Sequence, residues 1–262
     1  MNNYNNFNNY DAQRGYQQYS QQQYGQYVAD AGAQATPVVN DSVFAVLMRK
    51  VYVWMALALA VTGLTAYGIA SSDRLVEMVF SSQAVFWVCA IIELGLVIWL
   101  SAAINKLSFT TAAIMFVVYS FVNGITMSFI FLAYTMSSIA LTFFVSAGAF
   151  AGMALIGYFI KKDLSGIGKF LLYALIGIII ASVVNIFVKS SGMEFVISII
   201  GVLVFAGLTA YDSQKIKEML LQSGGEVNEM TQKIALMGSL SLYLDFINLF
   251  LYLLRFLGKA RD

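Results

Sequence analysis

The stretch IALMGSLSLYLDFINLFLYLLRFL, residues 234–257, is an apolar segment with a carboxylate at its centre. It is long enough for a helix to cross about 30 Å of hydrocarbon. Asp245 lies 11 residues after the first residue of the stretch and 12 before the last. An Asp at the centre of a membrane helix costs about 2.5–3.5 kcal/mol on insertion scales, so such a residue is usually paired or functional.

Polar or small residues recur along this stretch at helical spacing. Successive members are 3, 4, 3, 4 and 3 residues apart, which places them on one face of a helix. This polar stripe is predicted to face protein or water, while Leu, Phe and Ile occupy the opposite face. The alternative is a structural acid that hydrogen-bonds neighbouring helices. The stripe consists of Gly238, Ser241, Asp245, Asn248, Tyr252 and Arg255.

The rest of the chain has the same apolar character. Of its 262 residues, 60% are hydrophobic and 11% charged, against about 25% charged in soluble domains. Helices are expected because lipid leaves no partner for open backbone groups. The sequence predicts an all-α polytopic membrane protein with seven transmembrane helices in residues 41–262. The seven apolar runs are 51–70, 84–104, 109–134, 139–160, 170–188, 193–211 and 234–257.

Residues 1–40 form a different region, rich in Asn, Gln and Tyr. This tail lacks the aliphatic residues needed for a core and is predicted to be disordered. With seven spans and a cytoplasmic N-terminus, ten Lys and Arg residues lie inside and five outside. This excess favours that orientation.

Composition also excludes several functions. The chain has no histidine and a single cysteine, Cys89. Ser-His and Cys-His nucleophile pairs and histidine-bearing zinc sites are therefore absent, so no enzyme and no cofactor are expected. An aspartate pair that hydrolyses peptides is the remaining enzymatic alternative. The net charge of +1 gives no general attraction to nucleic acid.

Asp212 ends the sixth run, and its helix is expected to continue past the bilayer to a turn with Gly224 as its stop and Asn228 as the next cap. Counted from that turn, Asp212 and Asp245 lie on adjacent antiparallel helices about 9 Å apart in depth. The count leaves them out of contact, and helix tilt or a later cap could close the gap. Two carboxylates in a poorly solvated site would share one proton and respond to pH. Once deprotonated, the pair would suit Ca²⁺, which prefers oxygen ligands.

Other polar residues lie inside the apolar runs. Glu93 is a candidate gating or relay acid, or else a hydrogen-bonding partner of a neighbouring helix. Asn123 and Asn185 are expected to hydrogen-bond between helices. KKDLSG, residues 161–166, is expected to be a cytoplasmic anchor and helix start. Three glycines suggest close helix packing: Gly148, Gly152 and Gly157.

Two motifs carry a family resemblance. GLTAYDSQKIK (207–217), followed by SLYLDFINLFLYLLRF (241–256), resembles the paired signature of the Bax inhibitor family of transmembrane proteins, its bacterial branch above all. KKDLS (161–165), NGITMS (123–128) and VNIF (184–187) resemble family segments in the same order.

The resemblance implies a central seventh helix and a pH-sensitive calcium leak in a bacterial inner membrane, with Asp212 and Asp245 as the gating and metal-binding pair. It also implies an arginine partner for Glu93 about eleven residues later. Ile104 occupies that position here, and Lys106 is a poorer substitute. Some members of the family instead restrain a membrane protease, which leaves a non-transporting regulator as the alternative. Supporting polar residues are Tyr211, Ser241, Asn248, Arg255, Asn185 and Asn123.

Overall fold

A computed structural model describes residues 41–223 and 226–261, which are almost entirely helical. In that part of the chain the extended structure is limited to an isolated bridge between Tyr134 and Ala260. The predicted disordered tail (1–40) and the predicted stop at Gly224 lie outside the described residues. The helices are α2 (Asp41–Ala70), α3 (Asp73–Phe80), α4 (Gln83–Ala103), α5 (Phe109–Met127), α6 (Phe129–Ala133), α7 (Met136–Phe159), α8 (Ser165–Val188), α9 (Ser191–Gln222) and α10 (Glu229–Leu257).

Six spans in the described residues are long and apolar enough to cross a membrane. They are α2, α5 with α6 as one span (Phe109–Ala133), α7, α8, α9 and α10. The remaining predicted run, 84–104, corresponds to α4, whose apolar part, Trp87–Ala103, is shorter than the other spans. The all-α membrane architecture is therefore confirmed, whereas the count by length and composition is six.

α2 begins ten residues before the predicted apolar run. Its first turns are amphipathic: Leu47 and Val51 are fully buried and Met48 nearly so, whereas Arg49 is exposed. Lys50 donates a hydrogen bond to Gln232 at the start of α10 (3.1 Å). A search for apolar runs finds the part of a helix that lies in hydrocarbon. It misses amphipathic turns that pack against protein on one face and meet water on the other.

The third predicted run is interrupted at Ser128, between α5 and α6. The Ser128 hydroxyl donates to the Ile125 carbonyl (2.6 Å), and the Ser128 amide donates to the same oxygen (3.3 Å). This local bonding three residues back replaces the regular helical pattern.

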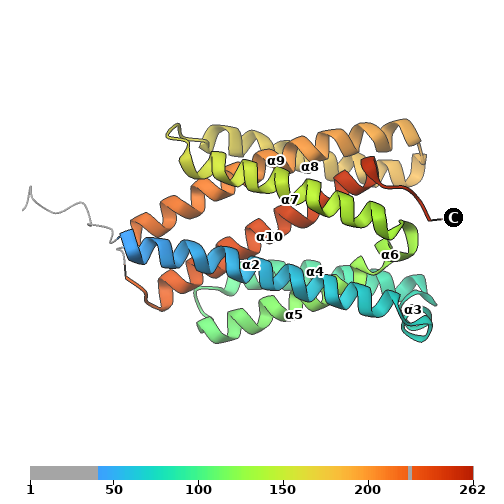
Figure 1. The fold of residues 1–262 in the computed structure, drawn as a ribbon, viewed down its shortest axis with the longest axis horizontal. Helices are drawn as coiled ribbons and strands as arrows, with labels where there is room; N and C mark the ends of the chain where they lie inside the picture. Colours follow the sequence, from blue (N-terminus) through green and yellow to red (C-terminus); the bar gives the residue numbers. More distant parts are fainter. Residues whose placement is uncertain (1–40, 224–225, 262) are drawn as a thin grey trace, which may run out of the picture. The chain divides into compact units, whose positions relative to one another are not determined.

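α10 occupies the centre of the helical bundle. It packs against α9, α2, α7 and α5, and Figure 1 shows it running between α7, α8 and α9 on one side and α2, α4 and α5 on the other. Its apolar window is 67% buried, against 11% for α8, which packs mainly on α9. This matches the central C-terminal helix that the resemblance implies.

Side chains at the helix ends explain where α8 and α10 begin. Asn228 caps α10 in a reciprocal capping box with Thr231, as predicted. Before α8, the Asp163 carboxylate accepts a hydrogen bond from the Ser165 amide (2.8 Å). Hydrogen bonds from the Ser165 side chain and backbone hold the pKa of Asp163 below its ordinary value. The KKDLSG segment therefore contains the predicted helix start.

The C-terminal residues return to the α6–α7 corner. The Thr135 amide donates to the Lys259 carbonyl (3.1 Å), and the Arg261 amide donates to the Ala133 carbonyl (3.0 Å). The Lys259 amide donates to the Ser138 hydroxyl (2.9 Å). These bonds tie the end of the central helix to its neighbours.

Candidate functional site

The two aspartates lie on the most extensively packed helix pair, α9 and α10. Asp245 is 5% exposed and Asp212 is half-buried. The charge of Asp212 acts on the buried Asp245 carboxylate, and no direct hydrogen bond joins the two within the described residues. Figure 1 shows α10 tilted across the bundle, and that the two aspartates act as a pair stays a prediction.

The polar stripe of α10 faces α9. A methyl group on Gly238 would come within 2.9 Å of Ile216, and one on Gly201 within 2.6 Å of Tyr252. The Tyr252 ring also stacks on Phe205, with 5.7 Å between centroids. These contacts lie on both sides of Asp245, so the stripe points into protein. The opposite face is buried too, as Leu242 and Leu249 show, because α10 is enclosed by other helices.

Asp245 has an incomplete set of hydrogen bonds. Its Oδ2 atom is buried and has no hydrogen-bond partner within the described part of the chain. A bare carboxylate oxygen in this position is costly unless it is protonated or meets a cation. Lys215 is the cation within electrostatic reach of Asp212, and it lies 5.8 Å from the centre of the Tyr211 ring.

The pair cannot form a complete metal site from side chains alone. Within residues 41–223 and 226–261, no group of three or more His, Cys, Asp or Glu side chains could hold a metal ion. Ca²⁺ takes about 6–8 oxygen ligands, so carbonyl groups and water would have to supply the rest.

Glu93 enters a hydrogen-bonded network that crosses four helices. It accepts hydrogen bonds from the Thr126 hydroxyl (2.5 Å) and the Asn123 amide (3.4 Å). Asn123 in turn accepts from the Tyr243 hydroxyl (2.8 Å), which is paired with Thr62 (2.7 Å). The expected inter-helix bond of Asn123 is thus present, and the network joins α4, α5, α10 and α2.

Lys106 is not brought to Glu93. It lies 13 residues further on, in the exposed turn after α4, which corresponds to about 20 Å along a helix. Among the described residues the recorded ion pair joins Lys233 to Glu229 instead. Two neutral donors on α5, Asn123 and Thr126, occupy the place that a basic partner would take.

The supporting residues fall into separate regions. Asn248 donates to the Leu244 carbonyl of its own helix (2.8 Å), while Ser241 and Tyr211 are half-buried near the aspartates in sequence. Asn185 accepts from the Ser190 amide (3.0 Å), so its bond lies in the α8–α9 turn instead of between packed helices. Arg255 is exposed and lines a different pocket with Asn185.

Sequence reasoning missed Tyr243, Thr62 and Gln214. Tyr243 and Thr62 are almost fully buried hydroxyl residues. Their position inside apolar runs was the sequence signal that could have identified them as hydrogen-bonding residues. Gln214 follows Asp212 by two residues and holds the loop before α8. It accepts from the Leu164 amide (2.8 Å) and donates to the Lys162 carbonyl (2.9 Å).

Comparison with known proteins identifies the family. Residues 45–262 match the family described as inhibitor of apoptosis-promoting Bax1. The chain belongs to the Bax inhibitor family. It is 46% identical over 214 residues to the inner membrane protein YbhL of Escherichia coli, covering 82% of this chain and 92% of YbhL.

Two further relatives have similar coverage. A protein of Borreliella burgdorferi is 45% identical over 217 residues, covering 82% of this chain and 92% of the relative. A protein of Rickettsia prowazekii is 43% identical over 215 residues, covering 82% and 90%. This member of the Bax inhibitor family is therefore an integral membrane protein whose matched region begins just after the tail.

Proposed function

We propose that this chain is a pH-sensitive leak channel for Ca²⁺, gated by protonation of the pair Asp212 and Asp245. The observation that carries the proposal is the buried Oδ2 atom of Asp245, which has no hydrogen-bond partner in the described residues and lies on the helix that packs most extensively against the helix of Asp212. With one proton between them, the acids hold α9 and α10 together. When that proton leaves, the acids repel each other or attract a divalent cation.

Ca²⁺ is the cargo in this proposal, and the pair is a transient stop on its path. The likeness to an inner membrane protein of Escherichia coli supports a bacterial inner membrane as the location. The family resemblance supports calcium as the ion. We further infer that α4 is the seventh span, which leaves the N-terminus in the cytoplasm and the C-terminus outside.

Calcium flux into liposomes tests the proposal. Full-length protein and the variants Asp212→Asn and Asp245→Asn would be reconstituted with a calcium dye inside, and uptake measured from pH 5 to 8. Asparagine cannot titrate and only one acid remains in each variant, so each variant is expected to show an altered Ca²⁺ flux and an altered pH profile. Asp73→Asn is the matched control, because Asp73 is exposed at the start of α3 and should leave the profile unchanged.

Two outcomes would reject the leak. Either the Asn variants keep the unaltered pH profile, or the purified protein carries no Ca²⁺ at any pH. In the second case, a membrane protease that co-purifies with the full chain would favour the alternative of a non-transporting regulator. Deletion of residues 1–40 would then reduce capture of the protease.

A further inference from the structure

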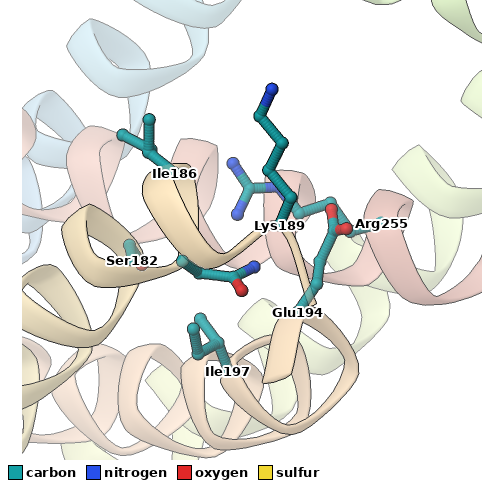
Figure 2. Close-up of a pocket in the computed structure, with 7 residues that line it drawn as sticks. Ser182, Ile186, Lys189, Glu194, Ile197 and Arg255 are labelled. Carbon is teal, nitrogen blue, oxygen red and sulfur yellow. The ribbon is translucent and has the colours of Figure 1, made fainter. Parts of the chain in front are cut away.

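A second polar site lies where α8, α9 and α10 meet, apart from the aspartate pair. It is a pocket of about 420 Å³ at the end of α8, the start of α9 and the end of α10. Figure 2 shows side chains from all three helices around it. The lining residues are Ser182, Asn185, Ile186, Lys189, Glu194, Ile197 and Arg255.

The charged side chains of the pocket are not paired with one another. Lys189 and Arg255 are cations and Glu194 is an acid, yet none of them takes part in the ion pair recorded for the described residues. In Figure 2 the Lys189 amine extends away from the other side chains, and the Arg255 guanidinium lies against α8. The lining thus offers two cations and one anion to a ligand.

Arg255 is held in place before any ligand arrives. Its guanidinium carbon is 5.4 Å from the centre of the Tyr252 ring, and that ring stacks on Phe205. A planar guanidinium fixed in this way binds phosphate through two parallel hydrogen bonds at a reduced entropic cost. Arg255 is therefore suited to an anionic phosphate oxygen.

Neutral polar groups complete the lining. The Ser182 hydroxyl oxygen is buried and has no hydrogen-bond partner in the part of the chain that the structure describes. Asn185 uses its Oδ1 atom for the Ser190 amide (3.0 Å), which directs its NH₂ group elsewhere. A hydroxyl and an amide can donate to further phosphate oxygens.

Lys189 is the one non-glycine residue with positive φ in the described chain, at 53°. This left-handed conformation ends α8, where glycine is normally preferred. The Lys189 amide donates to the Asn185 carbonyl (2.7 Å), which holds the turn. The turn alone would favour glycine at this position, so we attribute the presence of lysine to the positive charge of its side chain.

The surroundings of the pocket favour a lipid over a free ion. Large apolar side chains next to the pocket residues in sequence are exposed, among them Phe187 (82%), Phe195 (53%) and Phe256 (48%). In a membrane these side chains face acyl chains. A phosphate that reaches Arg255 and Lys189 at this level would arrive attached to such chains.

We propose that this pocket binds the headgroup of phosphatidylethanolamine. Its phosphodiester binds Arg255, with Ser182 and Asn185 as further donors, and its primary ammonium donates to Glu194. The Lys189 amine, which points away from the other side chains in Figure 2, turns toward the phosphodiester when the lipid binds. The headgroup carries one negative charge, which the two cations of the lining attract, and one positive charge, which the single acid attracts. A choline headgroup has the same charges but no N–H group to donate to Glu194.

Native mass spectrometry of the full-length protein in detergent tests this site. The protein would be titrated with dihexanoyl phosphatidylethanolamine, dihexanoyl phosphatidylcholine and inorganic phosphate, and unfolding midpoints measured in parallel. Arg255→Gln is expected to weaken phosphatidylethanolamine binding about tenfold or more, because glutamine keeps at most one of the two hydrogen bonds and loses the positive charge. Glu194→Gln is expected to abolish the preference for ethanolamine over choline while phosphate binding persists.

Lys189→Gly separates binding from folding. Glycine adopts the left-handed conformation without strain, so the unfolding midpoint should stay the same or rise, whereas lipid binding should fall. Arg74→Gln, at an exposed residue of α3 outside the pocket, is the matched control and should bind normally. Equal binding by the unaltered protein and the pocket variants would overturn the proposal, and so would inorganic phosphate that binds as tightly as the lipid.

Discussion

At the scale of single residues, Tyr243 joins the central helix α10 to the hydrogen-bonded network around Glu93. Its side chain is fully buried on α10, and its hydroxyl links Asn123 of α5 to Thr62 of α2. Its ring also packs edge-on against Phe116, with 5.7 Å between centroids. One hydroxyl therefore connects the central helix to two neighbours, two residues before Asp245.

Tyr243→Phe is expected to destabilise the protein by about 1 kcal/mol, because Asn123 and Thr62 each lose a buried partner while the ring contacts remain. The free energy of unfolding in mixed detergent micelles checks this. Tyr173→Phe is the matched control, since Tyr173 is 73% exposed on α8. Equal effects of the two substitutions would show that the network contributes nothing to stability.

At the scale of helices, the glycines of α7 are not equivalent. A methyl group on Gly157 would lie 2.0 Å from the Ala210 carbonyl oxygen of α9, whereas Gly148 and Gly152 have no atom within 4 Å of the corresponding position. Gly157 therefore lets α7 approach α9 closely at Ala210, which precedes Asp212 by two residues. The predicted close packing holds for Gly157 and not for the other two glycines.

Gly157→Ala and Gly152→Ala are expected to act in opposite directions. The first forces the α9 backbone away and should cost about 1–3 kcal/mol or more. The second should be neutral or stabilise the helix by up to about 1 kcal/mol, because alanine has the higher helix propensity. Thermal unfolding of the two variants in the same detergent measures this, and a stable Gly157→Ala variant would contradict the observed approach of α7 to α9.

At the scale of the whole molecule, the number of spans decides on which side each terminus lies. Seven spans place residues 1–40 and the C-terminal residues on opposite sides of the membrane, whereas six place them on the same side. α4 is the helix in question, since its apolar part is shorter than the other spans.

Cysteine labelling in intact cells tests the topology. In a Cys89→Ser background, Lys259→Cys is expected to react with a membrane-impermeant maleimide added outside, and Ser20→Cys only after the membrane is opened. This result follows from seven spans and a cytoplasmic N-terminus. Labelling of both positions from the same side would show that α4 does not span the membrane.

Composition and hydrophobic periodicity were sufficient to predict the class of this protein and most of its long helices. Long apolar runs in a chain with few charges can be stable only as membrane helices, because lipid leaves the backbone no other way to satisfy its hydrogen bonds. The helical repeat also placed Asp245 on a polar stripe, since that spacing depends only on the geometry of one helix.

The contacts between helices became visible in the folded bundle alone. Glu93 pairs with Asn123 and Thr126 in place of Lys106, and Gly157 alone of its three candidates touches a neighbouring helix. The pocket of Lys189, Glu194 and Arg255 draws on three helices. Such contacts depend on the tilt, rotation and depth of each helix. Many packing contacts together set these three quantities, so they cannot be read from the hydrophobic pattern of one helix.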